Sequence, residues 1–229
     1  EMNSKVVGAS GLSLKNDLRA DPQMVAALAE FGLDELTPPP PVTADSSLEE
    51  ILEFIVAAET NYQQIFDTWF DGLPPVDGMK RRTQSIRAEA GHEISLHIHE
   101  PAVRSGPIPC VYHIHGGGMV LLKATDSAYV RWRDELAATG MVVVGVEFRN
   151  AGGELGYHPF PAGLDDCASG LQWTNDHRQD LDISKIVVAG ESGGGNLSLA
   201  LTLKCKVAGS PGLIDGTYAM CPYISNSWA

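Results

Sequence analysis

Residues 190–194 are Gly-Glu-Ser-Gly-Gly, and Ser192 at their centre is a candidate for covalent chemistry. A serine hydroxyl can attack a carbonyl carbon when a sharp strand-to-helix turn presents it, and flanking glycines permit such a turn because they carry no side chains. An apolar segment, residues 185–189, precedes the motif, and an amphipathic segment, residues 193–207, follows it. This context predicts a strand, a nucleophile elbow with Ser192 as the nucleophile, and then a helix.

A run of glycines follows a second segment with strand character. Residues 115–118 are His-Gly-Gly-Gly, directly after the apolar residues 109–114. Acyl transfer places negative charge on a carbonyl oxygen, and the site must aim N–H groups at that oxygen. Glycines let backbone amides approach it closely, and the amide of Gly193, next to the serine, is the expected remaining donor.

Three segments resemble the hormone-sensitive-lipase family of α/β-hydrolase esterases. They are residues 115–118, residues 190–194 together with Asn196, and residues 147–162, which begin Glu-Phe-Arg-Asn and end His-Pro-Phe-Pro-Ala. The resemblance covers about residues 80–225 and implies an α/β-hydrolase fold with an N-terminal helical cap.

The resemblance also implies site residues and an activity. Ser192 would be the nucleophile, and Gly117, Gly118 and Gly193 would form the oxyanion hole. His115 would hold the glycine loop by hydrogen bonds. The implied reaction is hydrolysis of carboxylic esters with short or medium acyl chains, through an acyl-enzyme and without a cofactor.

The chain departs from the family pattern after the serine. A serine hydrolase of this fold has its acid and then its histidine base downstream of the nucleophile. Downstream of Ser192 this sequence contains no histidine and one acid, Asp215. We therefore expect the C-terminal part of the fold, with the triad Asp and His, to come from sequence beyond residue 229, in the same polypeptide or as a separate chain. Gly193 stands where many family members have alanine, which should loosen the turn slightly.

Other functions compete with the esterase. A small-molecule receptor on the same fold would need no base, and an amidase or deacetylase would share the mechanism and differ in the leaving group. A metal site is a further alternative, because His97 and His99, and likewise His113 and His115, lie on one face of their strands. The glycine loop already accounts for His115, and no carboxylates have ligand spacing, so no metal is expected.

Aromatic residues at helical spacing in residues 47–71 first predict a packing face. Trp69 and Phe70, at the end of this segment, are also candidates for a substrate pocket, and so is Met119 beside the glycine loop. The expected partner is a small-molecule ester, and a homodimer with a second copy of the chain is left open.

Two regions are expected along the chain. Helices at about 21–32 and 47–71, separated by the prolines of 38–41, form the predicted cap, residues 1–78. Residues 79–229 form the predicted core, in which strands at 82–90, 93–100, 109–115, 141–148, 185–189 and 216–224 are interspersed with helices at 125–139, 161–178 and 193–207. Such a pattern predicts a mostly parallel sheet covered by helices on both faces.

Composition narrows the class of protein. The 229 residues carry a formal charge of −13, so the basic surface of a nucleic-acid-binding protein is missing. No apolar run approaches the ~20 residues of a membrane span. The four cysteines lie in apolar segments without a Cys-x-x-Cys pair, which is typical of buried reduced thiols in a cytoplasmic protein.

Overall fold

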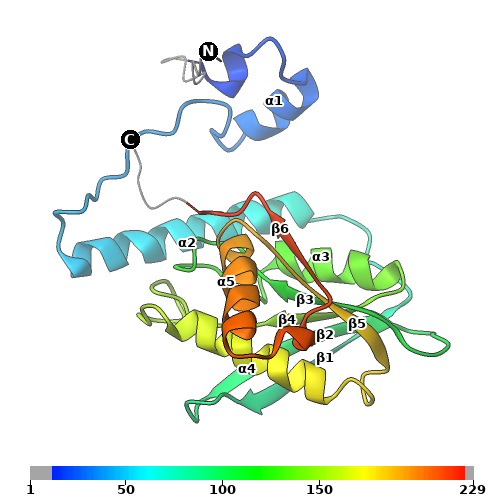
Figure 1. The fold of residues 1–229 in the computed structure, drawn as a ribbon. Coiled ribbons are helices and arrows are strands. Elements are labelled where there is room, and N and C mark those ends of the chain that lie inside the picture. The colour runs from blue at the N-terminus through cyan, green and yellow to red at the C-terminus, as the bar shows by residue number, and fades with distance from the viewer. Residues whose placement is uncertain (1–11, 225–229) are drawn as a thin grey trace, which may run out of the picture. The chain divides into compact units, whose positions relative to one another are not determined.

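The computed structural model describes residues 12–224, which divide into two compact units between Ser47 and Leu48 (Figure 1). The first unit contains the short 3₁₀ helix η1 (Leu14–Asn16) and helix α1 (Pro22–Ala29). The Asp21 side chain accepts hydrogen bonds from the backbone N–H groups of Gln23 and Met24 and so caps the start of α1.

The second unit contains all the remaining helices and strands. In chain order they are α2 (Leu48–Phe70), β1 (Met79–Arg87), β2 (Glu93–Pro101), β3 (Ile108–Ile114), α3 (Ser127–Ala138), β4 (Val142–Val146), α4 (Ala162–Asp176), β5 (Ile183–Glu191), α5 (Gly193–Val207), η2 (Pro211–Leu213) and β6 (Gly216–Met220). Each predicted element is present, although the last strand ends at Met220 and not at residue 224. Within residues 12–224, no helix combines the length and the apolar character needed to cross a bilayer.

The six strands form one mixed sheet in the order β1-β2-β4-β3-β5-β6. The pairs β1–β2 and β2–β4 are antiparallel, whereas β4–β3, β3–β5 and β5–β6 are parallel. Helices α3, α4 and α5 each connect successive parallel strands, as the chain order requires. The predicted α/β fold with a mostly parallel sheet is confirmed.

The two faces of the sheet differ in chemistry, and β2 shows why. Leu96 and Ile98 point toward the apolar core beneath α4 and α5, where Tyr112 donates a hydrogen bond from its hydroxyl to the Cys167 carbonyl at 2.9 Å. The alternate residues, His97 and His99, point to the opposite face, which α3 covers. The core is therefore on one side of the sheet, and buried polar groups are on the other.

The boundary between the two compact units lies between Ser47 and Leu48, so α2 is in the same unit as the sheet. The reason is that α2 packs on α3, and its buried Glu59 bonds to backbone groups of two core loops. The division into a helical cap, residues 1–78, and a core, residues 79–229, stays a prediction.

The edge of the sheet at β6 carries exposed apolar side chains. Tyr218 is 58% exposed and Met220 39%, and on neighbouring α5 Leu203 is 62% exposed. Among the described residues no strand pairs with the outer edge of β6. The expectation that all four cysteines are buried is wrong for Cys221, which is exposed, and right for the other three.

Packing of α4 on the sheet generates a stability prediction. A Cβ added at Gly170 would collide with the Tyr112 hydroxyl and lie 3.0 Å from Leu96 Cδ2. We expect Gly170→Ala to lower the free energy of unfolding by about 1–3 kcal/mol, because the core must shift and the Tyr112 hydrogen bond is disturbed. Urea unfolding measures this, with Gly212→Ala as control, since a Cβ there meets nothing within 4 Å. Equal stability of the two variants would contradict the packing.

Candidate active site

Ser192 lies at the junction of β5 and α5 in a conformation that side-chain-bearing residues rarely adopt. Its φ is 54° and its ψ −116°, the strained geometry of a nucleophile elbow. Backbone bonds hold it on both sides: its N–H donates to the Met220 carbonyl at 3.0 Å, and its carbonyl accepts from Asn196 and Tyr223, each at 3.0 Å. Ser192 is thus the residue that precedes the first turn of α5.

The glycines around Ser192 are required by close backbone contacts. A Cβ at Gly190 would lie 2.5 Å from the Ile114 carbonyl oxygen, and a Cβ at Gly194 would collide with that same oxygen. A Cβ at Gly193 would lie 2.7 Å from the backbone nitrogens of both Gly118 and Met119. Because Gly193 has no side chain, the backbone of the glycine loop can occupy the space beside it. The slight loosening of the turn by Gly193 stays a prediction.

The loop after β3 lies against Gly193, the first residue of α5, and three of its residues have positive φ. Gly117 has φ 97°, Gly118 φ 65° and Met119 φ 65°, and a Cβ at Gly117 would collide with the Leu121 carbonyl. Within residues 12–224 the N–H groups of Gly117 and Gly118 donate to no protein acceptor. The N–H of Gly193, first residue of α5, has no partner inside its helix. The glycine loop thus lies against Gly193, the residue after Ser192, and the roles predicted for Ser192, Gly117, Gly118 and Gly193 stay predictions.

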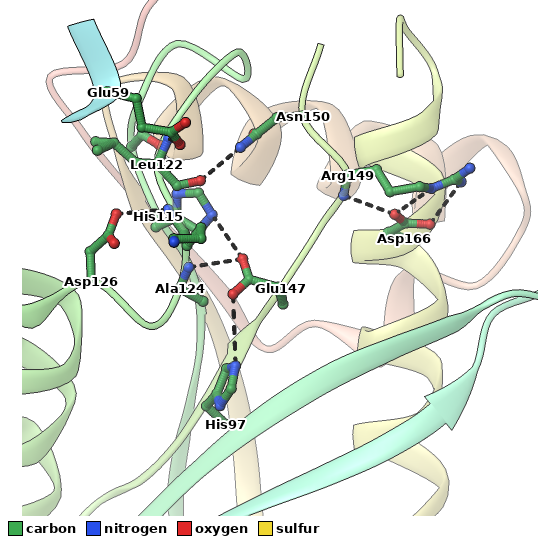
Figure 2. Close-up of polar contacts among 12 residues, drawn as sticks. Glu59, His97, His115, Leu122, Ala124, Asp126, Glu147, Arg149, Asn150 and Asp166 are labelled. Atoms are coloured by element: carbon green, nitrogen blue, oxygen red, sulfur yellow. Dashed lines mark hydrogen bonds and ion pairs between the residues drawn. The ribbon is translucent and has the colours of Figure 1, made fainter. Parts of the chain in front are cut away.

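Carboxylates from distant elements hold this loop. Glu191 accepts a hydrogen bond from the Gly116 N–H at 2.7 Å, and its other oxygen lies 3.2 Å from His113 Nε2. Glu147 accepts from the Ala124 N–H at 2.9 Å and lies between two imidazoles, as Figure 2 shows: its oxygens are 3.7 Å from His115 Nε2 and 3.9 Å from His97 Nε2.

His115 has the structural role that the resemblance implied. Its Nδ1 contacts the Gly116 carbonyl at 2.8 Å, and its ring stacks on Phe148 with a centroid separation of 4.3 Å. The side chain is fully buried and therefore fixes the first peptide of the glycine loop.

A buried guanidinium joins this network from α3. The Arg133 side chain is fully buried, donates from Nη2 to the Ala124 carbonyl at 2.5 Å and from Nε to His99 Nε2 at 3.1 Å. Gly145 of β4 makes room for it, since a Cβ there would lie 2.8 Å from Arg133 Cδ. Burial lowers the pKa of Arg133 to about 10, against the opposing effect of Glu147, and leaves the group cationic at neutral pH.

The geometry defines the protonation state of His99. Its Nδ1 lies 2.7 Å from Asp134 Oδ1 and its Nε2 accepts from Arg133, so the ring is neutral with the proton on Nδ1. Burial and the Arg133 charge lower the pKa of His99 to about 4, although Asp134 acts in the opposite direction. Burial likewise lowers the pKa of His97 and His113.

The histidine pairs that suggested a metal site therefore serve other contacts. Each lies against a carboxylate, a guanidinium or an aromatic ring on the face under α3. In the described part of the chain, no three His, Cys, Asp or Glu side chains converge as ligands.

The three predicted pocket residues have different surroundings. Met119 follows the glycine loop, packs partly on the core, and its carbonyl accepts from the Ala151 N–H at 2.9 Å. Phe70 lines a cavity of about 310 Å³ together with His113, Trp132 and Glu191. Trp69 is 40% exposed, and the centroid of its ring lies 6.1 Å from that of Phe66 on the same helix. It is not among the residues that line the cavity containing Phe70.

Several residues that build the site were not singled out by sequence reasoning. The signal existed for Glu59, which lies four residues after Ile55 and three before Tyr62 on the predicted apolar stripe of α2. An acid on such a stripe is a sign of a buried polar contact. Asp126 and Arg133 were not singled out either, whereas Glu147 and Asn150 lie in a segment that carries the family resemblance but were given no role of their own.

A mixed sheet with parallel central strands, a strained serine between strand and helix, and an adjacent glycine loop together define the class of α/β hydrolases. The chain belongs to the alpha/beta hydrolase fold family, whose profile matches residues 111–228, more than half of the sequence. The expected relation to hormone-sensitive lipase is confirmed by the structural neighbour described next.

Known proteins with similar sequence or structure are esterases and related enzymes. The solved structure of brefeldin A esterase, described as a bacterial homologue of human hormone sensitive lipase, superimposes with a TM-score of 0.88 at 43% identity, covering 93% of this chain and 59% of that one. Esterase Est22 gives a TM-score of 0.82 at 35% identity, covering 95% and 65%. The carboxylesterase NlhH of Mycobacterium tuberculosis is 33% identical over 124 residues, 53% of this chain and 37% of its own.

A plant relative matches more of the chain. The chloroplastic tuliposide A-converting enzyme 2 of Tulipa gesneriana is 25% identical over 208 residues, which are 84% of this chain and 51% of the enzyme. The chain thus spans between about a third and two thirds of the length of these proteins.

The neutral state of His99 generates a pH prediction. The pKa of His99 is about 6.5 in the unfolded chain and about 4 in the folded chain. The neutral ring therefore contributes its full stabilisation above pH 6.5, and this contribution is lost as the pH falls toward 4. We expect His99→Gln to reduce the slope of unfolding free energy against pH in this window, as measured by urea unfolding at several pH values. His177→Gln, at the end of α4, is the control and should keep the wild-type slope. An unchanged slope in His99→Gln would contradict the assignment.

Proposed function

We propose that this chain carries the nucleophile and the oxyanion hole of a serine carboxylic-ester hydrolase. The observation that carries the proposal is the strained Ser192 beside three N–H groups, those of Gly117, Gly118 and Gly193, without acceptors among the described residues. Unpaired donors at such a site are the arrangement that stabilises a developing oxyanion. The esterase relatives support the same reaction class.

The proposed reaction has two covalent steps. Ser192 Oγ attacks the ester carbonyl carbon while a base takes its proton, and the carbonyl oxygen becomes an oxyanion held by the three amides. The C–O bond to the alcohol then breaks, the alcohol leaves with that proton, and an acyl-enzyme remains. Water attacks the acyl-enzyme by the same route and releases the carboxylic acid.

The base and its orienting carboxylate are proposed to come from polypeptide other than residues 1–229. None of the seven histidines lies downstream of Ser192. His113 and His115 are buried and bonded beneath the loop, where they cannot take the serine proton without unfolding it. The uncovered edge of β6 is the place where further sheet would add the missing residues.

The proposed substrates are esters with short or medium acyl chains. Met119, next to the glycine loop, and Phe70, in the cavity beside Glu191, supply apolar surface near the elbow. Trp69 at the exposed end of α2 is the least supported of the three pocket residues.

Labelling tests the nucleophile. In the esterase that contains this chain together with its acid and base, a fluorophosphonate should form one covalent adduct, located on Ser192 by mass spectrometry, because only this hydroxyl is activated. Ser192→Ala should abolish both labelling and hydrolysis of p-nitrophenyl acetate. The 229-residue chain alone should show negligible turnover for want of a base.

Other outcomes would redirect the proposal. Activity retained in Ser192→Ala, or an adduct elsewhere, would remove the serine mechanism. Rapid turnover by residues 1–229 alone would contradict the external base. Tight binding of a small ester without labelling in any form would favour the receptor function.

Gly193 gives a second test of the oxyanion hole. In Gly193→Ala the new Cβ would press on the backbone nitrogens of Gly118 and Met119, and this must push the glycine loop away. We expect kcat for p-nitrophenyl acetate to fall on the order of 10²-fold, the cost of misplacing an oxyanion donor, with little change in KM. Steady-state kinetics measure this beside Gly212→Ala as control. A kcat within twofold of wild type would argue against these amides as the hole.

A further inference from the structure

Glu59 of α2 is a fully buried carboxylate with two backbone donors and, among the described residues, no cation within ion-pair distance. Its Oε1 accepts from the Leu122 N–H at 2.6 Å and its Oε2 from the Glu154 N–H at 2.6 Å. The two donors belong to different loops. A buried carboxylate is costly unless such charge-assisted bonds compensate it, so the two bonds must be kept together.

The first of these bonds acts on the end of the glycine loop. Leu122 is buried with φ 74°, and the Asn150 Nδ2 donates to its carbonyl at 2.7 Å, so both sides of the residue are held (Figure 2). The preceding turn is closed, because the Gly117 carbonyl accepts from the N–H groups of Val120 at 3.0 Å and Leu121 at 3.1 Å. The position of Leu122 is thereby transmitted to Gly117 through a rigid turn.

The second bond acts on the loop of residues 151–156. Gly153 has φ 68°, and a Cβ there would lie 2.5 Å from Glu59 Oε2, so only glycine allows this approach. Beside it, a Cβ at Gly152 would touch Ile55 of α2 at 3.2 Å and Val120 of the glycine loop at 3.3 Å. Three segments distant in sequence therefore meet around one carboxylate.

From this junction we propose that Glu59 is a positioning residue for the oxyanion hole, which couples helix α2 to the glycine loop through Leu122. The inference rests on the proposed function, because it assumes that Gly117 and Gly118 donate to the oxyanion. Glu59 does not touch the substrate. It requires both oxygens of a carboxylate: glutamine keeps one acceptor and turns an NH₂ group toward the other N–H, which leaves two donors facing each other.

Kinetics give the first test. In the complete esterase, assayed well below its unfolding temperature, Glu59→Gln should lower kcat for p-nitrophenyl acetate by about 10- to 100-fold with KM changed less than twofold, because a misplaced loop affects the transition state more than ground-state binding. Glu53→Gln is the matched control, since Glu53 is exposed on the same helix, and it should behave as wild type. A kcat within twofold of wild type in Glu59→Gln, even with a lower Tm, would overturn the proposal.

Amide NMR of the 229-residue chain gives a second test that needs no turnover. In Glu59→Gln the amide proton of Leu122 or Glu154 should move upfield as its bond to a carboxylate is lost, and the amide resonances of Gly117 and Gly118 should shift as well. Glu53→Gln should move none of them. Unshifted glycine resonances in Glu59→Gln would overturn the coupling.

The two tests separate this inference from the proposed function. If Ser192→Ala stays active while the glycine resonances respond to Glu59→Gln, the esterase mechanism fails and the coupling stands. If Glu59→Gln does not fold, Asn150→Ala removes the bond to the Leu122 carbonyl and should produce the same kcat loss and the same shifts at Gly117 and Gly118. Wild-type kinetics and resonances in that variant would overturn the proposal.

Discussion

Carboxylate side chains accept from four backbone N–H groups around the glycine loop, whereas the N–H groups of Gly117, Gly118 and Met119 donate to no acceptor among the described residues. Glu191 takes the N–H of Gly116, while further along Glu59, Asp126 and Glu147 take those of Leu122, Lys123 and Ala124. Because the four acids come from α2, the loop itself and the ends of two strands, the loop is held from several directions. The loop that carries Gly117 and Gly118, whose N–H groups donate to no acceptor within residues 12–224, is therefore held in one conformation.

The two faces of the sheet differ in polarity, and the acids around the glycine loop lie near the polar face. Below α4 and α5 the sheet is apolar, and below α3 it carries imidazoles and the buried guanidinium of Arg133, which bonds to the Ala124 carbonyl. A cation there compensates Glu147 and Asp134, whose burial would otherwise be unfavourable. Burial raises the pKa of Asp126, and a bond from the Lys123 N–H opposes this rise. The apolar core on one face of the sheet thus stabilises the fold, and the polar groups on the other face hold the glycine loop in position.

Backbone strain is concentrated at the same place. Ser192, Met119 and Leu122 all have positive φ, and none is glycine. Conformations of this kind cost on the order of 1–3 kcal/mol each and persist only when surrounding contacts over-determine them. Those contacts are present: Ser192 is tethered by β6 and α5, Met119 by Ala151, and Leu122 by Glu59 and Asn150.

The sequence by itself determined the elements and the motif. Periodicity located the α-helices and the strands, though not the short 3₁₀ helices η1 and η2, and glycine spacing located the turns at 115–118 and 190–194, because these signals are local. It did not place α2 with the core, assign Glu59, Arg133 or Glu147, or show that Gly193 leaves space for Gly118. Those features depend on contacts between residues up to about a hundred positions apart, such as Glu59 with Glu154, and only the folded chain decides which of its many acids meet a backbone donor.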